Sequence, residues 1–496
     1  MQTRETPAPA SGEDSGARPD PVGRFGLRRF ATSAGLLSLT SIANFARAVI
    51  AAKLFAITLG PSNVGILAQL LNFSALVSVV VPLGLTTGVA KMVAEGRGDQ
   101  RHVTRVTITA SALALSSALV AAIVLAPAAG PISSALTGSS QYALPILLLV
   151  ASFPLYNLSA VLAYVLQGLA DVRRLTRANI ITTALAVGLL VPLTLAYGLN
   201  GAIASVLVTS ALQALVFGAV LWTAYAARAW RFIQAGFDRA LAKQLLAYGG
   251  ILLLGAVANQ SSLLIVRTTT VHSLGQTANG LYQVVFGLSS QYITIFMAWM
   301  GAYVFPRLVA EGRAGRLNSL LNSGLRANLA LMVPILVISI ALRVPLIHVF
   351  YSASFVASAP LIPIQALGDY ARIVGWSFAV CLFAVGHTRS HLLLIAAQAT
   401  TWVLLATALV PQWGLVAIPA SYALSFLTYP LMGIALTHHW VGARPDRTSI
   451  LLIAVGLVCI LGSLAPLYLG LVFAPAMPAI VYWLNRHELA KPRIAV

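Results

Sequence analysis

The chain has 496 residues, of which 59% are hydrophobic and only 9% are charged. This composition excludes a soluble globular domain of that length and predicts an all-α integral membrane protein. Lys and Arg outnumber Asp and Glu by 31 to 12, which gives a formal net charge of +19. In a membrane protein such an excess favours contact with anionic lipid headgroups, so we expect membrane lipids and no nucleic acid among the partners.

Residues 1–30 combine Pro, Gly, Ser and charged residues without an apolar core, and they predict a disordered cytoplasmic tail. Two series of apolar runs follow, each run close to the roughly 20 residues that one bilayer crossing needs. The first series lies at 33–57, 65–88, 106–130, 141–167, 178–198 and 201–226. The second series lies at 245–266, 278–304, 325–342, 356–385, 392–410 and 414–437. A last run at 450–484, interrupted near Pro466, predicts two short spans, so we expect about 14 transmembrane helices.

Basic residues mark one side of these spans. All Lys and Arg residues except five lie before the first span, after an even-numbered span or at the end of the chain. Lys and Arg near span ends mark the cytoplasmic side of a membrane. The distribution therefore predicts a multi-pass protein with both termini in the cytoplasm.

Short sequences recur in the second part of the chain at an offset that is constant to within one position. "VAEGR" at 93–97 returns at 309–313, "IAN" at 42–44 matches "VAN" at 257–259, and "YGLNGAIAS" at 197–205 matches "WGLVAIPAS" at 413–421. Two halves that each contain an even number of spans enter the membrane from the same side, so we expect parallel repeats around a central cleft. The predicted units are a six-helix half at 31–227, an amphipathic cytoplasmic linker helix at 228–244, a second six-helix half at 245–440 and a C-terminal helical hairpin at 448–485.

Five basic residues lie outside the cytoplasmic set: Arg47, Lys53, Arg267, Arg343 and Arg372. A charged side chain near the bilayer centre costs about 2.5–3.5 kcal/mol, so we expect it to face a wet cavity or a partner. Arg47 lies inside the first span, and Lys53 and Arg267 lie at matching depths of the two halves. These three are the candidate cations of a substrate site, with snorkelling to the outer interface as the alternative.

A few polar residues add to this candidate site. Asp369 lies within a predicted span, and Arg372 follows at i+3, so the two predict either a coupling or gating pair or a mutually neutralising structural pair. Asn44 and Asn259 occupy matching positions of the two halves. They are candidates to bond sugar hydroxyls, with interhelical packing as the alternative.

Motifs of catalysis are sparse. His387 and His391 have the i, i+4 spacing of a metal-binding helix face, but no third ligand accompanies them in the sequence, so we expect no metal site. The sequence contains no phosphate-binding loop of an ATP-driven pump and no nucleophile elbow. We therefore expect no cofactor and no enzymatic activity.

The duplicated halves, the basic residues of the first span, and the sequences "KLFAITLGPSNVGILAQ" at 53–69, "KMVAEGRGD" at 91–99 and "LQGLADVRR" at 166–174 resemble Wzx-type polysaccharide flippases. The resemblance covers the chain from about residue 30. It implies membership of the multidrug/oligosaccharidyl-lipid/polysaccharide exporter superfamily, and a cationic cavity for which Arg47, Lys53 and Arg267 are the matching candidates.

The function that this resemblance implies is a flippase of the bacterial inner membrane. Such a protein moves undecaprenyl-pyrophosphate-linked oligosaccharide repeat units from the cytoplasmic to the periplasmic leaflet by alternating access. The glycan would be an O-antigen, an exopolysaccharide or a related surface glycan, and polysaccharide polymerase and chain-length machinery are further candidate partners.

Two other functions remain open from the sequence. A multidrug exporter of the same superfamily would need acidic residues for cationic drugs, and the first six predicted spans provide none beyond Asp171 at a span end. A membrane glycan polymerase or ligase is the second alternative, and joining of sugar units by the purified protein would favour it.

Overall fold

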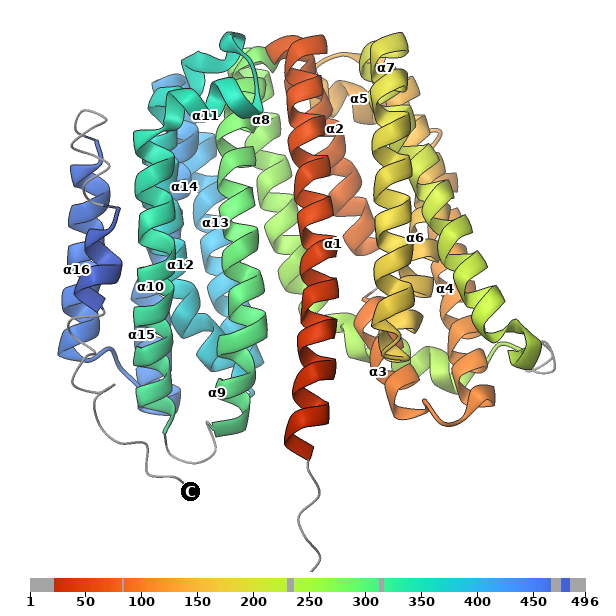
Figure 1. Ribbon diagram of the computed structural model, residues 1–496. Helices are drawn as coiled ribbons and strands as arrows, with labels where there is room; N and C mark the ends of the chain where they lie inside the picture. The colour runs from red at the N-terminus through yellow and green to blue at the C-terminus, as the bar shows by residue number, and fades with distance from the viewer. Residues whose placement is uncertain (1–21, 83, 230–235, 312–315, 465–473, 482–496) are drawn as a thin grey trace, which may run out of the picture.

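The computed structural model describes residues 22–82, 84–229, 236–311, 316–464 and 474–481, and these ranges contain helices and turns but no strand. Most helices stand side by side in one upright bundle (Figure 1). We call the end that carries α5 and α11 the upper end, and the end that carries α3 and α9 the lower end. The helices in chain order are α1 (Val22–Thr58), α2 (Gly60–Val80), α3 (Leu85–Glu95), α4 (Gln100–Leu125), α5 (Ala129–Thr137), α6 (Ala143–Gly168), α7 (Val172–Ala229), α8 (Arg239–Trp299), α9 (Phe305–Glu311), α10 (Leu317–Ala341), α11 (Arg343–Phe350), α12 (Ile362–Ala384), α13 (Thr388–Trp413), α14 (Ala417–Phe426), α15 (Thr428–Val441) and α16 (Arg447–Gly462).

Short helices of other types connect some of these elements. They are the 3-10 helices η1 (Ser140–Tyr142), η5 (Ala353–Leu361) and η6 (Gly414–Val416) and the π-helix η3 (Met300–Val304).

Nine helical stretches of the described chain are long and apolar enough to cross a membrane, which confirms the all-α membrane class. Three of them, Val172–Thr223, Leu253–Ala310 and Thr388–Val441, contain 52, 58 and 54 residues. Each of these three is long enough for two crossings of about 20 residues. The chain breaks its helical conformation within them at Gly198, Gly275 and Gly414, whose φ angles of 56°, 85° and 63° suit glycine. In α7 the resulting turn lies at the upper end (Figure 1).

Three boundaries differ from the sequence prediction or fall outside the described residues. The disordered tail predicted at 1–30 is wrong for residues 22–30, which belong to α1, and residues 1–21 lie outside the described residues. The span predicted at 65–88 is wrong as a single helix, because α2 ends at Val80 and α3 begins at Leu85, after Gly84 with a φ of 73°. The predicted linker helix at 228–244 falls partly on residues 230–235, which lie outside the described residues. On either side of that gap, α7 ends at Ala229 and α8 begins at Arg239.

Backbone positions with positive φ recur at the offset of the repeated sequences. The separation within each pair equals, to within one position, the separation of the short sequences that recur. The pairs are Gly60 with Gly275, Ala170 with Gly386, and Gly198 with Gly414. The same turn is thus used at corresponding places of the first and second parts of the chain.

The glycines at 65 and 280, which have the same separation, lie where α2 crosses the second leg of α8. A Cβ atom on Gly280 would lie 1.8 Å from the carbonyl oxygen of Pro61, and one on Gly65 would lie 2.1 Å from that of Gln276. Asn279 Nδ2 donates a hydrogen bond of 2.7 Å to the carbonyl oxygen of Gly65. The two backbones therefore touch directly, and neither position has room for a side chain.

The first "VAEGR" sequence has a structural role at the lower end. Arg97 donates from Nε and Nη2 to the carbonyl oxygen of Gly168, at distances of 3.1 and 2.7 Å. A cation at the end of a helix satisfies carbonyl groups that have no partner within the helix. Arg97 therefore holds the turn after α3 against the end of α6, whereas the corresponding Arg313 lies outside the described residues.

The first helix of the predicted C-terminal hairpin packs on the bundle through polar contacts. Arg326 Nη2 of α10 lies 2.5 Å from Asp446 Oδ2, at the start of α16. Higher along α16, Tyr370 OH of α12 donates a hydrogen bond of 2.5 Å to the carbonyl oxygen of Ile453. Part of the hairpin predicted at 448–485 falls on residues 465–473 and 482–485, outside the described residues, so these contacts concern its first helix.

Asp446 makes the attachment of α16 sensitive to acid. Partial burial alone would raise its pKa, but the hydrogen bonds of Ser449 and the guanidinium of Arg326 outweigh burial and lower the pKa below the ordinary 3.8. A group whose pKa is lowered by folding stabilises the folded state above its ordinary pKa, and this contribution is lost as the pH falls through the lowered value. Acidification below pH 3.8 should therefore lower the thermal stability of the parent protein more than it lowers that of the Asp446→Asn variant. Thermal unfolding in detergent measures both. An equal loss in both proteins would contradict this role.

Candidate functional site

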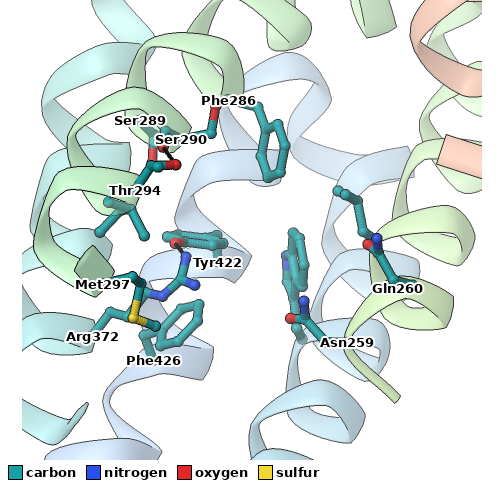
Figure 2. Close-up of a pocket in the computed structure, with 13 residues that line it drawn as sticks. Asn259, Gln260, Phe286, Ser289, Ser290, Thr294, Met297, Arg372, Tyr422 and Phe426 are labelled. Carbon is teal, nitrogen blue, oxygen red and sulfur yellow. Dashed lines mark hydrogen bonds between the residues drawn. The ribbon is translucent and has the colours of Figure 1, made fainter. Parts of the chain in front are cut away.

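A cavity of about 320 Å³ lies between α8, α12, α13 and α14. Because α8 turns back at Gly275, both of its legs contribute to the walls. Figure 2 shows Arg372, Tyr422 and Met297 on one side of the cavity, with Asn259 and Gln260 on the other. The lining residues are Asn259, Gln260, Leu263, Phe286, Ser289, Ser290, Ile293, Thr294, Met297, Arg372, Trp402, Tyr422 and Phe426. One of these described lining residues is basic, and none is acidic.

The carboxylate of Asp369 lies behind this wall and is fully buried, with 0% of the residue exposed. Its Oδ2 accepts hydrogen bonds from Ser289 Oγ at 2.7 Å and from Tyr292 OH at 2.5 Å, and its Oδ1 accepts one from Tyr422 OH at 2.7 Å. Three hydroxyl groups from α8 and α14 thus surround one carboxylate of α12. Such donors replace the water that a buried charge loses.

Arg372 contacts the same network from the cavity side. Its Nη1 donates a hydrogen bond of 3.2 Å to Tyr422 OH, and its guanidinium lies 5.2 Å from the centre of the Phe426 ring. The ion pairs of the described residues do not include one between Asp369 and Arg372. The structure joins the two predicted partners through the Tyr422 hydroxyl, which donates to Asp369 and accepts from Arg372. The choice between a coupling or gating pair and a structural pair stays a prediction.

Arg267, a predicted substrate cation, does not line this cavity and is only 1% exposed, although its guanidinium lies 5.2 Å from the centre of the Phe286 ring in the cavity wall. Its Nη1 donates to Asn279 Oδ1 at 3.2 Å, and its Nη2 donates to Gln283 Oε1 at 2.5 Å. Asn279 in turn bonds the carbonyl oxygen of Gly65. Arg267 therefore supports the crossing of α2 and α8 in this conformation.

Lys53, the second predicted cation, joins α1 to the end of α11. Its Nζ donates hydrogen bonds of 2.7 Å to the carbonyl oxygens of both His348 and Tyr351. The C-terminus of a helix carries partial negative charge, so an ammonium group stabilises it. Next to this contact, Ser352 Oγ donates to the carbonyl oxygen of Ala56 at 3.3 Å.

Further polar contacts join α5 to α8 near the upper end. Gln276 Nε2 donates a hydrogen bond of 2.6 Å to the carbonyl oxygen of Thr137, and His272 Nε2 lies 2.8 Å from that of Ala135. Together with Lys53 and the glycine crossing, these contacts link the first and second parts of the chain. The described residues thus form a closed upper end.

Arg47, the third predicted cation, is exposed on α1 and has no hydrogen-bond or ion-pair partner among the residues that the structure describes.

The two matching asparagines have different surroundings. Asn44 Oδ1 accepts a hydrogen bond of 3.3 Å from Thr183 Oγ1 of α7, whereas Asn259 lines the cavity. Packing is therefore the observed role of Asn44, and Asn259 remains a candidate for substrate contact.

Sequence reasoning did not identify Tyr422, Trp402, Ser289 or Tyr292 as parts of the site. Each lies in an apolar span, where aromatic and hydroxyl residues are common. The available signal was weak: Tyr422 lies between Ser421 and Ser425 in the sequence "SYALS", which places several hydroxyl groups within about one helical turn.

Comparisons of the sequence point to one class of protein. A family model described as "Polysaccharide biosynthesis protein" matches residues 54–360. The chain is 24% identical to the lipid III flippase of Escherichia coli (strain K12) over 382 residues, which cover 76% of this chain and 90% of that flippase. The lipid III flippase of Shigella flexneri gives the same values.

Comparisons with solved structures identify the fold. A multidrug resistance MATE family transporter of the MOP superfamily, in an inward-facing conformation, matches with a TM-score of 0.70 at 15% identity, over 80% of this chain and 94% of that chain. An outward-facing structure with the same family description matches with a TM-score of 0.60 at 15% identity, over 83% and 95% of the two chains.

Proposed function

Because the chain belongs to the polysaccharide biosynthesis protein family and has the fold of the MOP superfamily transporters, we propose that it is a flippase for lipid-linked glycans. Its substrate is an undecaprenyl-pyrophosphate-linked oligosaccharide unit, which it moves from the cytoplasmic to the periplasmic leaflet of the inner membrane. The glycan part and the pyrophosphate are too polar to cross hydrocarbon unaided, whereas the polyprenyl tail stays in the membrane throughout.

The unequal exposure of Asp369 and Arg372 carries this proposal. The carboxylate lies under three hydroxyl groups, whereas the guanidinium lines the cavity. A ligand in the cavity therefore meets the positive charge first. A site of this polarity suits an acidic, hydroxyl-rich substrate and disfavours a cationic drug.

The proposal places the lower end in the cytoplasm, together with both termini. This orientation is supported by the basic residues near the lower turns, among them Arg97, Arg316 and Arg444. The layout is two parallel six-helix repeats followed by a hairpin, about 14 spans in total. The recurrence of positive φ at the offset of the repeated sequences supports the repeat.

The conformation described here is open toward the cytoplasm in this proposal, because the upper end is closed. Transport by alternating access then requires the contacts of Lys53 with α11 and of Gly65 with Gly280 to separate. Lys53 and Arg267 act mainly in this closure, whereas Arg47, Arg372 and Asn259 are the groups left for the substrate.

Reconstitution tests the proposed function directly. The purified chain in proteoliposomes should expose a fluorescent undecaprenyl-pyrophosphate-linked disaccharide to a membrane-impermeant quencher faster than protein-free vesicles do. The same vesicles should not transport ethidium, a cationic compound typical of multidrug export. Ethidium transport without movement of the lipid-linked sugar would instead assign the chain to the multidrug exporters.

A further inference from the structure

The cavity beside Arg372 carries more aromatic and amide groups than a phosphate site needs. Tyr422 packs against Phe426 at a centroid distance of 4.6 Å and against Trp402 at 5.3 Å, so three rings of α13 and α14 form one wall. Asn259 and Gln260 lie across the cavity from Tyr422 and Phe426 (Figure 2). Aromatic faces carry negative charge that attracts the C–H face of a sugar ring, and amides bond its hydroxyl groups.

The size of the cavity suits a small part of a glycan. Its volume of about 320 Å³ lies at the lower limit of the roughly 300–1,000 Å³ found for small-molecule sites. A cavity of this size fits one sugar unit.

The charge balance of the wall limits the anion that it can hold. The positive charge of Arg372 is matched by the negative charge of Asp369 through the shared Tyr422 hydroxyl. The pair is therefore neutral, with its positive member toward the cavity. A pyrophosphate diester, with about two negative charges, would need more positive charge than this, whereas a single carboxylate can bond the guanidinium side by side.

Two hydrogen-bond donors on the wall have no acceptor among the described residues. Arg372 Nε and Trp402 Nε1 are both buried and make no hydrogen bond with any described residue. Buried donors of this kind are satisfied in native proteins by water or by a ligand. Trp402 is only 3% exposed and packs edge-on against Tyr422, so its indole is held in a fixed position in this wall.

We propose that this cavity binds one acidic sugar unit of the transported glycan, with a carboxylate on Arg372 and the sugar ring against Trp402 and Phe426. The inference rests on the proposed function and names the class of glycan that the flippase selects. The pyrophosphate then lies outside this cavity. Asp369 and Tyr422 are positioning residues: Tyr422 bonds the guanidinium, and the negative charge of Asp369 offsets its positive charge, so that binding stays reversible.

Binding of small sugars by the full-length protein in detergent tests the proposal, with nuclear magnetic resonance titration as the measurement. The probes are methyl glucuronide, methyl glucoside and inorganic pyrophosphate. Methyl glucuronide should bind at least about tenfold more tightly than methyl glucoside, because a hydrogen-bonded charge pair contributes that much. Equal binding of the two sugars overturns the proposal. Pyrophosphate binding that is tighter than glucuronide binding and depends on Arg372 assigns the cavity to the carrier instead.

Substitutions show which side chains cause the preference for glucuronide. Arg372→Gln should remove the preference for the glucuronide, and Arg372→Lys should keep part of it. Asp369→Asn should raise glucuronide affinity several-fold, because it removes the balancing negative charge; a purely structural role of Asp369 predicts no such gain. Arg307→Gln, at a cation that instead stacks on Tyr303 outside this cavity, is the matched control and should bind like the parent.

The outcomes separate this inference from the proposed function. Size-exclusion chromatography and thermal unfolding show whether each variant is folded. If Arg372→Gln is not folded, the glucuronide affinity of Asp369→Asn decides whether the proposal holds. Transport of a neutral lipid-linked sugar without any glucuronide preference leaves the flippase function intact and overturns the acidic-sugar site. Glucuronide binding without transport of lipid-linked sugars overturns the flippase function alone.

Discussion

Replacing Gly280 with alanine should abolish transport while the protein still inserts into the membrane. The new Cβ atom would lie 1.8 Å from the carbonyl oxygen of Pro61, so α2 and α8 must move apart at their crossing. Overpacking of this kind costs about 1–3 kcal/mol or more, and here the cost falls on the state with the closed upper end. A shift of that size changes the ratio of closed to open molecules by about 5- to 150-fold.

Cysteine labelling measures this shift. Val64, which lies beside the crossing and is 5% exposed, can be replaced by cysteine as a reporter. Labelling with a maleimide in detergent should be slow in the parent background and fast with Gly280→Ala. Gly188→Ala is the control, because nothing lies within 4 Å of its added Cβ atom. Normal transport by Gly280→Ala would show that the glycine crossing need not close as tightly as the structure shows.

Replacing Arg47 with alanine should also abolish transport of the lipid-linked sugar, with the protein folded and at normal level in the membrane. Arg47 is exposed on α1 and has no partner among the described residues, so its removal breaks no described contact. A cation kept within a span at a cost of about 2.5–3.5 kcal/mol is expected to serve a ligand. The planar guanidinium fits phosphate oxygens better than an ammonium group does, so Arg47→Lys should retain part of the activity.

The glutamine variant separates a charge requirement from a packing role. If Arg47 only extends to the interface, Arg47→Gln should transport as well as Arg47→Lys. Arg343→Gln is a suitable control, since Arg343 Nη1 donates a hydrogen bond to the carbonyl oxygen of Ile340, three residues earlier at the end of α10. Surface glycan in cells that lack their own copy, or transport in proteoliposomes, provides the measurement. Full activity of Arg47→Ala would exclude this residue from the substrate path.

The membrane class, the resemblance to Wzx-type flippases of the MOP superfamily and the positions of several turns could be predicted from the sequence. The first two follow from composition and from the quoted sequences, and the family match and the similarity to the lipid III flippase confirm the resemblance. The breaks predicted between the runs at 178–198 and 201–226 and between those at 392–410 and 414–437 lie within a few positions of the turns at Gly198 and Gly414. Glycine is visible in a sequence, and positive φ is a property of single residues, so local reasoning reaches this far.

The site could be predicted only in part, because depth in the membrane does not reveal which neighbour a side chain meets. Arg267 was assigned to the substrate site from its predicted depth, but its partners Asn279 and Gln283 reach it across the turn at Gly275. Asp369 and Arg372 were identified as a unit, yet the hydroxyl that joins them belongs to Tyr422, 53 residues from the carboxylate. Such contacts depend on how helices pack, and one sequence contains no direct record of that packing.

The turns at Gly198 and Gly275 also constrain how the protein is made. Each joins two membrane-spanning legs of one continuous helix through a single non-helical residue. Each connection is a tight turn between two helical legs rather than an extended loop. We therefore expect the two legs to enter the membrane together as a hairpin, after about 40 residues have been synthesised. An epitope tag inserted at either glycine would separate the legs and interfere with this step before any transport could be measured.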